Sequence, residues 1–293
     1  MAGARADLQC LAWGISWWPF RWLEQRGLHP LLTTAIVYVV AGAVIVTWRP
    51  RAVGQLLRLP SLWVIAFAAG TTLAMFNWGV VVGDVVRVVL LFYLMPLWTV
   101  VLARVLLNEP ITARAGARVL LAVGGAVVVL WPAGRGWEAL PLPRSLADWL
   151  GIAGGIAFAL NNVASKRAAH HPEQARVLAM FVGGALVSSG LATVLTLAGR
   201  IPNAEALSAL NAGLVPVLLV LVGLFLASTL ALQYGVARLS ANVSSVVMLT
   251  EVLFAAGSAL ALGAGSLTLQ LAIGGLLIVG AALLSALGPD AAG

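Results

Sequence analysis

The sequence predicts an all-α integral membrane protein, with ten transmembrane helices arranged as two inverted five-helix repeats around a central cavity. Three observations predict this fold. The chain of 293 residues is 61% hydrophobic and 9% charged, whereas soluble globular chains are about 45–50% apolar and about 25% charged. Its ten apolar segments each approach the ~20 residues that a helix needs to cross the hydrocarbon. Finally, the two halves of the chain can be laid over each other.

The apolar segments are separated by short connections, many of which contain proline or glycine. The segments run approximately 8–26, 30–48, 61–82, 85–107, 113–132, 146–166, 174–198, 211–236, 241–262 and 267–287. The first is bulky (Trp13, Trp17, Trp18) and no small-residue cleavage site follows it, so we interpret it as a membrane helix and not as a signal peptide.

Residues that favour helix N-caps stand before four of the later segments. Asp84 and Ser240 precede the segments 85–107 and 241–262, and Thr112 and Thr268 precede 113–132 and 267–287. We therefore expect Asp84 to be a helix cap and not a proton carrier. The GxxxG spacings Gly79–Gly83 and Gly151–Gly155 are expected to allow close packing of helices within one subunit.

The basic residues give an orientation. With a cytoplasmic N-terminus, 11 of the 17 Lys and Arg residues lie in cytoplasmic connections, as the positive-inside rule requires. Ten spans then place both termini in the cytoplasm. The formal charge of +7 forms no basic face, so nucleic-acid binding is not expected. The single Cys and three His residues show no metal-ligand spacing, and neither a metal site nor a cofactor is expected.

The internal repeat appears when the chain is shifted by 156 residues. Residues 77–80 (NWGV) then fall on 233–236 (QYGV), and 120–126 (LLAVGGA) fall on 276–282 (LLIVGAA). The first helices align with a shift of 145. Because each half holds five spans, an odd number, the second half enters the membrane from the opposite side. The predicted units are residues 1–138 and 139–293, and inverted repeats are typical of secondary transporters with a site near the midplane.

Several enzyme classes find no support in the sequence. The only lysine, Lys166, is not part of a phosphate-binding loop, and no embedded serine has a convincing base. What remains are polar and aromatic residues on helices that could face a cavity. The candidate substrate-binding residues are Trp13, Trp17, Asn77, Trp78, Asn161, Asn162, Gln233, Tyr234, Ser244, Ser245 and Met248. The alternative is that these residues join helices or anchor them at the membrane interface.

Three charged residues in the apolar segments leave alternatives open. Glu251 is either a structural lock or a group that couples transport to protons or binds an ammonium group. Arg21 and Lys166 end equivalent helices, and they either snorkel to the lipid headgroups or attract an anion at each mouth.

The stretches 83–112, 158–167 and 239–263 resemble the drug/metabolite transporter superfamily, in its ten-helix EamA-like branch, and the first is similar to aromatic amino acid exporters of the YddG type. The resemblance implies a basket of ten helices, alternating access between the halves, and export of amino acids, including aromatic ones. Such families carry Glu-Pro in the ninth helix, where this chain has Glu251-Val252. The repeat counterpart is Met95-Pro96.

We therefore expect an exporter of small zwitterionic solutes in a bacterial inner membrane, a monomer that binds amino acids between its halves. A carrier of another metabolite or drug, a membrane enzyme and a non-transporting scaffold are the alternatives.

Overall fold

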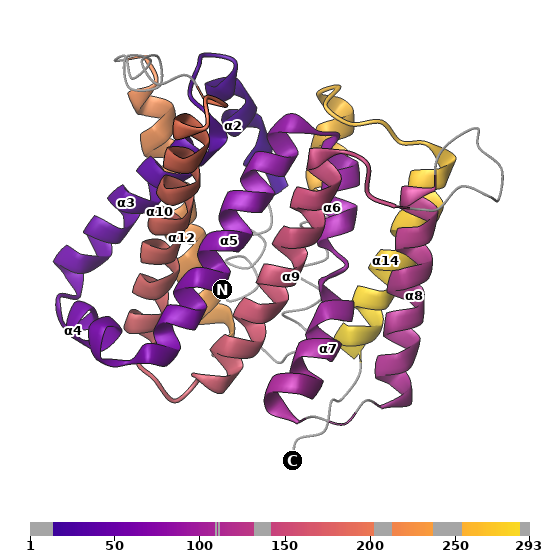
Figure 1. Ribbon diagram of the computed structural model, residues 1–293, viewed down its shortest axis with the longest axis horizontal. Helices are drawn as coiled ribbons and strands as arrows, with labels where there is room; N and C mark the ends of the chain where they lie inside the picture. Colours follow the sequence, from indigo (N-terminus) through magenta and orange to yellow (C-terminus); the bar gives the residue numbers. More distant parts are fainter. Residues whose placement is uncertain are drawn as a thin grey trace.

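The computed structural model describes residues 14–108, 110, 112–131, 142–201, 213–236 and 254–287, with side chains except at Arg114, 231–236 and 285–287. Within these ranges every regular element is helical (Figure 1). The labelled helices are α2 (Trp17–Glu24), α3 (Pro30–Trp48), α4 (Arg51–Arg58), α5 (Pro60–Val82), α6 (Val85–Phe92), α7 (Met95–Leu107), α8 (Ala113–Leu130), α9 (Leu146–Arg167), α10 (Glu173–Leu197), α12 (Val215–Val236) and α14 (Leu269–Leu287). Residues 254–261 are helical as well.

Length and composition identify the helices that can cross a membrane. Five described segments suffice: Pro30–Trp48, Pro60–Val82, Val85–Leu107, Leu146–Arg167 and Glu173–Leu197. Ala115–Leu130, Val215–Leu230 and Leu269–Leu284 are shorter apolar helices. The prediction of a multi-pass membrane protein is confirmed. The predicted number of ten spans is not confirmed, because part of the predicted segment 241–262 lies outside the described residues.

The connection between the second and third predicted spans holds an additional short helix, α4. Its residues Ala52 and Leu56, four apart, are buried, while Arg51, Leu57 and Arg58 are exposed. A spacing of four places two side chains on one face of a helix, so α4 covers the end of the bundle with a narrow apolar stripe. From the sequence, only a connection was predicted here.

Glycines allow the helices to approach closely at the predicted spacings. A Cβ atom on Gly83 would lie 2.3 Å from Ala147 Cβ, and one on Gly79 would lie 3.3 Å from Leu150 Cβ. On the facing helix, a Cβ atom on Gly151 would lie 3.0 Å from the carbonyl oxygen of Val88. The prediction that both GxxxG spacings serve packing within the chain is confirmed.

Two further crossings depend on glycine in the same way. Where α5 crosses α10, a Cβ atom on Gly70 would lie 2.2 Å from the carbonyl oxygen of Gly183. Where α8 crosses α14, a Cβ atom on Gly125 would lie 2.7 Å from the carbonyl oxygen of Gly274. These contacts join helices from the two halves of the chain.

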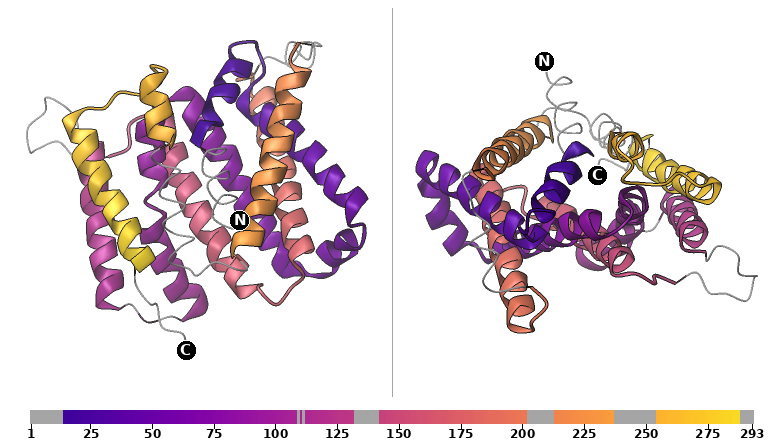
Figure 2. Two further views of the ribbon diagram at one scale, coloured as in Figure 1. Left: turned by 180° about the vertical axis from the view of Figure 1, so that it is seen from behind. Right: turned by 90° about the horizontal axis from the view of Figure 1, so that it is seen from above.

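The helices α8 and α14 lie side by side at one edge of the bundle (Figures 1 and 2). We name the two ends of the bundle by residues that lie there. The Gly83 end, uppermost in Figure 1, holds the junctions α5–α6 and the start of α9. The Ser61 end holds the starts of α5 and α10. In the predicted orientation the Gly83 end faces away from the cytoplasm.

Candidate functional site

The predicted span 85–107 is interrupted at its middle. Helix α6 ends at Phe92, a turn follows at Tyr93 and Leu94, and α7 begins at Met95. Pro96 has no N–H group, so the carbonyl of Phe92 cannot accept the hydrogen bond that normally comes from four residues further on. A Cβ atom on Gly155 would lie 2.5 Å from this carbonyl oxygen, so α9 covers it closely. The predicted span is confirmed by its length and composition, and the helix within it is divided at this turn. Interrupted membrane helices form substrate sites in many transporters.

Two buried polar atoms without partners lie level with each other beyond this interruption. The contacts of Gly151 with Val88 and of Gly155 with Phe92 advance by four residues on both helices, so α9 and α6 run parallel. Asn161 lies six residues after Gly155 on α9, and Trp98 lies six residues after Phe92. The two residues are therefore at a similar depth along the helices. Asn161 is 5% exposed and its Oδ1 has no hydrogen-bond partner. The buried Nε1 of Trp98 has none either.

An unpaired acceptor and an unpaired donor in the membrane interior are costly, because each forgoes its hydrogen bonds to water. Polar groups that remain unpaired in a folded protein often indicate a ligand, a water molecule or a functional role. Asn161 Oδ1 can accept from an ammonium group, and Trp98 Nε1 can donate to a carboxylate. Each of these two atoms is therefore a candidate for a polar contact with a solute.

Asn162 is exposed on a side of α9 that does not face lipid. Trp149 (58% exposed) and Ile156 (37% exposed) mark the outward face of this helix. At about 100° per residue, Asn162 is rotated by roughly 220° from Trp149, which places it on nearly the opposite side. Its exposure is therefore toward the interior of the bundle, as expected for a residue that lines a cavity.

The structure gives three other predicted site residues partners within the bundle. Trp17 donates from Nε1 to Ser258 Oγ at 3.0 Å. Asn77 is 1% exposed and donates from Nδ2 to Thr34 Oγ1 at 3.1 Å. The Trp78 ring packs edge-on against His29, with the ring centroids 5.6 Å apart.

These contacts do not gather the predicted residues into one site. Phe76, the residue before Asn77, lies at the level of Gly154 on α9, because a Cβ atom on Gly154 would lie 3.5 Å from the backbone nitrogen of Phe76. Asn77 therefore lies nearer the Gly83 end than Asn161 does. Trp13, Ser244, Ser245, Met248 and Glu251 lie outside the described residues, as do the side chains of Gln233 and Tyr234.

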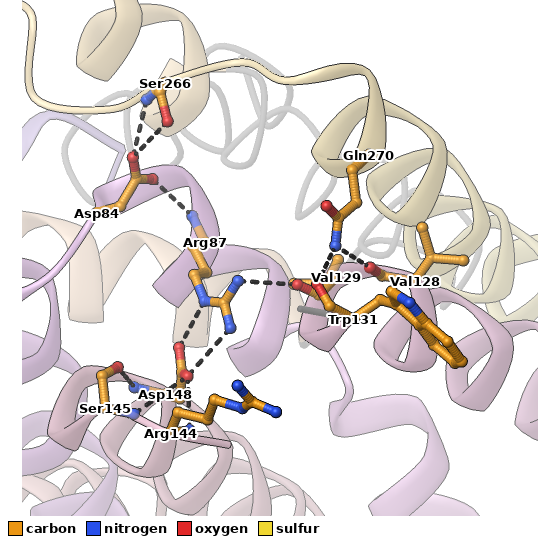
Figure 3. Close-up of polar contacts among 10 residues, drawn as sticks. All are labelled: Asp84, Arg87, Val128, Val129, Trp131, Arg144, Ser145, Asp148, Ser266 and Gln270. Atoms are coloured by element: carbon orange, nitrogen blue, oxygen red, sulfur yellow. Dashed lines mark hydrogen bonds and ion pairs between the residues drawn. The ribbon is translucent and has the colours of Figure 1, made fainter. Parts of the chain in front are cut away.

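A network of charged and polar groups occupies the Gly83 end (Figure 3). Arg87 binds Asp148 with two hydrogen bonds, Nε to Oδ1 at 2.6 Å and the terminal nitrogen to Oδ2 at 3.1 Å. Its other terminal nitrogen donates to the carbonyl oxygen of Val129 at 2.8 Å. Asp148, 1% exposed, also completes a capping box with Ser145 and accepts from the backbone N–H of Arg144. One guanidinium group thus joins α6, α8 and α9.

The same end ties the loop before α14 to the start of α6. Asp84 caps α6 by accepting from the N–H of Arg87 at 3.0 Å. Its second oxygen accepts from the backbone and side chain of Ser266, at 2.8 and 3.2 Å. Gln270 donates to the carbonyl oxygens of Val128 and Trp131, at 2.7 and 2.6 Å. The prediction that Asp84 is a cap is confirmed.

Arg21 has backbone partners that were not predicted from the sequence. Its guanidinium donates to the carbonyl oxygens of Val80, Gly83 and Ala264, at 2.9 Å for Val80 and 3.4 Å for Ala264. These carbonyls lie at the end of α5 and in the loop before α14. Arg21 therefore supplies hydrogen-bond donors to the end of α5 and to that loop. It also lines a shallow pocket of about 250 Å³ with Trp17, Trp18, Trp22, Gln25 and residues 262–264.

Two of these features were not predicted from the sequence. Trp98 was not a candidate, because its neighbours are apolar and nothing nearby in the sequence indicates that its N–H is unpaired. The ion pair Arg87–Asp148 joins residues 61 positions apart. Its one local signal is that both residues stand in first turns of predicted helices. Among the described residues, no group of three or more His, Cys, Asp or Glu could hold a metal ion.

The fold and this site describe a polytopic membrane protein with a polar interior. Residues 7–131 match the EamA-like transporter family, whose members are membrane transporters of the drug/metabolite transporter superfamily. A solved structure described only as a crystal structure of protein is similar, with a TM-score of 0.56 and 20% identity over 97% of this chain and 95% of that chain. At that identity the likeness supports the fold alone. A search of curated proteins found no match.

Proposed function

We propose that the chain is a secondary transporter that exports small zwitterionic solutes, amino acids including aromatic ones, by alternating access. The observation that carries the proposal is that Asn161 Oδ1 and Trp98 Nε1 are buried without partners on two neighbouring helices. The helix that holds Trp98 continues from an interrupted one. An amino acid brings an ammonium donor and a carboxylate acceptor, and each of these two atoms can bind one of those groups. Aromatic rings of Phe92 and Phe158, with centroids 5.4 Å apart, lie one to two turns away and favour an apolar or aromatic side chain.

The inverted repeat, with units 1–138 and 139–293, is part of the proposal. If each helix in the first unit corresponds to the one five spans later, α3 matches α10, α5 matches α12 and α8 matches α14. The pairs α3–α10 and α8–α14 then lie on the pseudo-symmetry axis, and both are in contact. The contact of α5 with α10 has its counterpart in the contact of α12 with α3. These contacts support an inverted repeat, whereas the close contact of α5 with α9 has no counterpart of similar extent between α12 and the described part of α2.

We expect the protein to reside in a bacterial inner membrane with both termini in the cytoplasm and to act as a monomer. A carrier of another metabolite or drug is the closest alternative. It would use the same polar residues but would not be inhibited by amino acids.

Flux measurements in proteoliposomes test the proposal. Purified protein should move labelled phenylalanine or threonine faster than empty liposomes do, and flux should be measured with and without a proton gradient. Trp98→Phe removes only the N–H group. Loss of a hydrogen bond to a charged group should raise the KM about tenfold or more. Trp149→Phe, the same change at an exposed position of α9, is the matched control and should leave the KM unchanged.

Three results would contradict the proposal. Absence of flux for a broad amino-acid panel would show that amino acids are not the substrates. An unchanged KM in Trp98→Phe and in Asn161→Ala would show that these residues do not bind the solute. Catalytic turnover that does not depend on a sealed compartment would favour a membrane enzyme instead.

A further inference from the structure

The two halves of the chain are residues 1–138 and 139–293. Most of the described side-chain hydrogen bonds between them lie at the Gly83 end. Among those whose two partners are both described, the bonded pairs at this end are Arg87–Asp148, Asp84–Ser266, Val128–Gln270, Trp131–Gln270, Arg21–Ala264, Trp17–Ser258 and Gly14–Ser258. At the Ser61 end the corresponding described contact is Ser61 with His171, at 2.9 Å and exposed. The two halves are thus fastened by polar contacts at one end.

The first turn of α6, residues 84–87, is the centre of this fastening (Figure 3). Arg87 holds α9 through Asp148 and holds α8 through the carbonyl of Val129. Asp84 holds the loop before α14 through Ser266. We call these three contacts of residues 84–87 the clasp.

The clasp attaches a pair of helices that has few other polar ties to the bundle. Helices α8 and α14 pack tightly on each other at Gly125 and Gly274, and Gln270 bonds the start of α14 to the end of α8. Beyond that pairing, their contacts within the described bundle are chiefly with α6 and α7. Apolar surface permits sliding, whereas a bidentate ion pair and hydrogen bonds to a carboxylate have one geometry. The clasp therefore ties this pair to α9 at the Gly83 end through residues 84–87 of α6.

We propose that the clasp is the lock that closes the Gly83 end of the transport pathway, and that Arg87 must release Asp148 before a solute can leave there. This inference rests on the proposed transport function. It assigns to the structure the state that is closed at the Gly83 end. The charges are suited to this role, because an ion pair that is separated while water enters can be rehydrated, whereas one separated in a dry interior cannot.

Thiol labelling tests the lock without any substrate. With Cys10→Ser as background, Asn162→Cys places a reporter on the interior face of α9, and a membrane-impermeant maleimide is added from the Gly83 side. Arg87→Met should raise the labelling rate about tenfold or more, because it leaves the buried carboxylate of Asp148 without its cation in the closed arrangement. Arg144→Met is the matched control, since the Arg144 side chain is exposed and only its backbone N–H joins the network. Equal labelling in both variants would overturn the proposal.

A second measurement covers the case in which Arg87→Met fails to fold. Asp84→Cys with Ser266→Cys, in the same background, allows a short bifunctional methanethiosulfonate reagent to bridge the clasp. The bridged protein should lose at least nine-tenths of its flux and should recover it when the bridge is reduced. Normal flux in the bridged protein would overturn the lock. If the parent protein moves no amino acid but its labelling responds to Arg87→Met, the lock stands and the proposed substrate fails.

Discussion

Gly183 offers the most direct test of how the helices are packed. A Cβ atom at this position would lie 1.8 Å from the carbonyl oxygen of Ala66, 2.4 Å from its carbonyl carbon and 2.7 Å from its Cα. All three atoms belong to the backbone of α5, so no side chain can rotate away. Gly183→Ala therefore forces α5 and α10 apart by about 1.6 Å to reach an ordinary contact, which weakens dispersion along the whole crossing.

The expected size of this effect follows from two opposing terms. Overpacking costs typically 1–3 kcal/mol, and a backbone obstacle places Gly183→Ala near about 3 kcal/mol. Alanine gains about 0.5–1 kcal/mol over glycine in a helix interior. The net loss is about 2 kcal/mol, which should appear as a lower Tm when detergent-solubilised protein is heated and the remaining folded fraction is measured by size exclusion.

Gly190→Ala is the matched control on the same helix. Nothing lies within 4 Å of a Cβ atom there, so only the gain in helix propensity applies. Its Tm should equal or exceed that of the parent protein. A Gly183→Ala protein as stable as Gly190→Ala would refute the close crossing of α5 and α10.

Three further variants test single contacts. Burial lowers the pKa of His29 to about 4, so a neutral ring is favoured by folding and stability should fall as the pH drops from about 6.5 toward 4; His29→Asn keeps an N-cap and should remove that slope in Tm against pH. Arg21→Met removes hydrogen bonds to three carbonyls and should cost about 1–3 kcal/mol in thermal stability, whereas Arg26→Met on the exposed surface should cost under about 1 kcal/mol; equal losses would contradict the assigned contacts. Gln270→Met should cost about 1–2 kcal/mol, because it removes two hydrogen bonds to carbonyls at the end of α8; an unchanged Tm would count against these bonds.

Features that depend on neighbours in the sequence could be predicted. Asp84, Thr112 and Thr268 accept backbone hydrogen bonds from residues three positions on, at 3.0, 3.2 and 3.2 Å, as their cap positions indicated. A cap is formed within one turn, so the sequence contains all the partners it requires. The glycine spacings predicted close helix packing for a similar reason, because glycines four residues apart leave one helix face without side chains.

Features that depend on distant partners could not be predicted in this way. Asn77 and Asn161 are both asparagines in apolar helices, yet Asn77 donates to Thr34 and Asn161 has an unpaired oxygen. Their local sequences do not distinguish these two states. The interruption after Phe92 was missed because Pro96 stands in an otherwise regular apolar segment, where a proline can either kink a helix or break it. Which of the two occurs depends on what the freed carbonyl packs against.

The carboxylate of Asp84 serves both a local contact, the start of α6, and a distant contact, with the loop before α14. One of its oxygens starts α6, and the other holds Ser266, 182 residues away. Asparagine could satisfy only one of these demands, since its amide offers a single acceptor oxygen and its nitrogen would face a donor. Asparagine at position 84 would keep the cap and lose the contact with Ser266, so only a carboxylate serves both contacts at once.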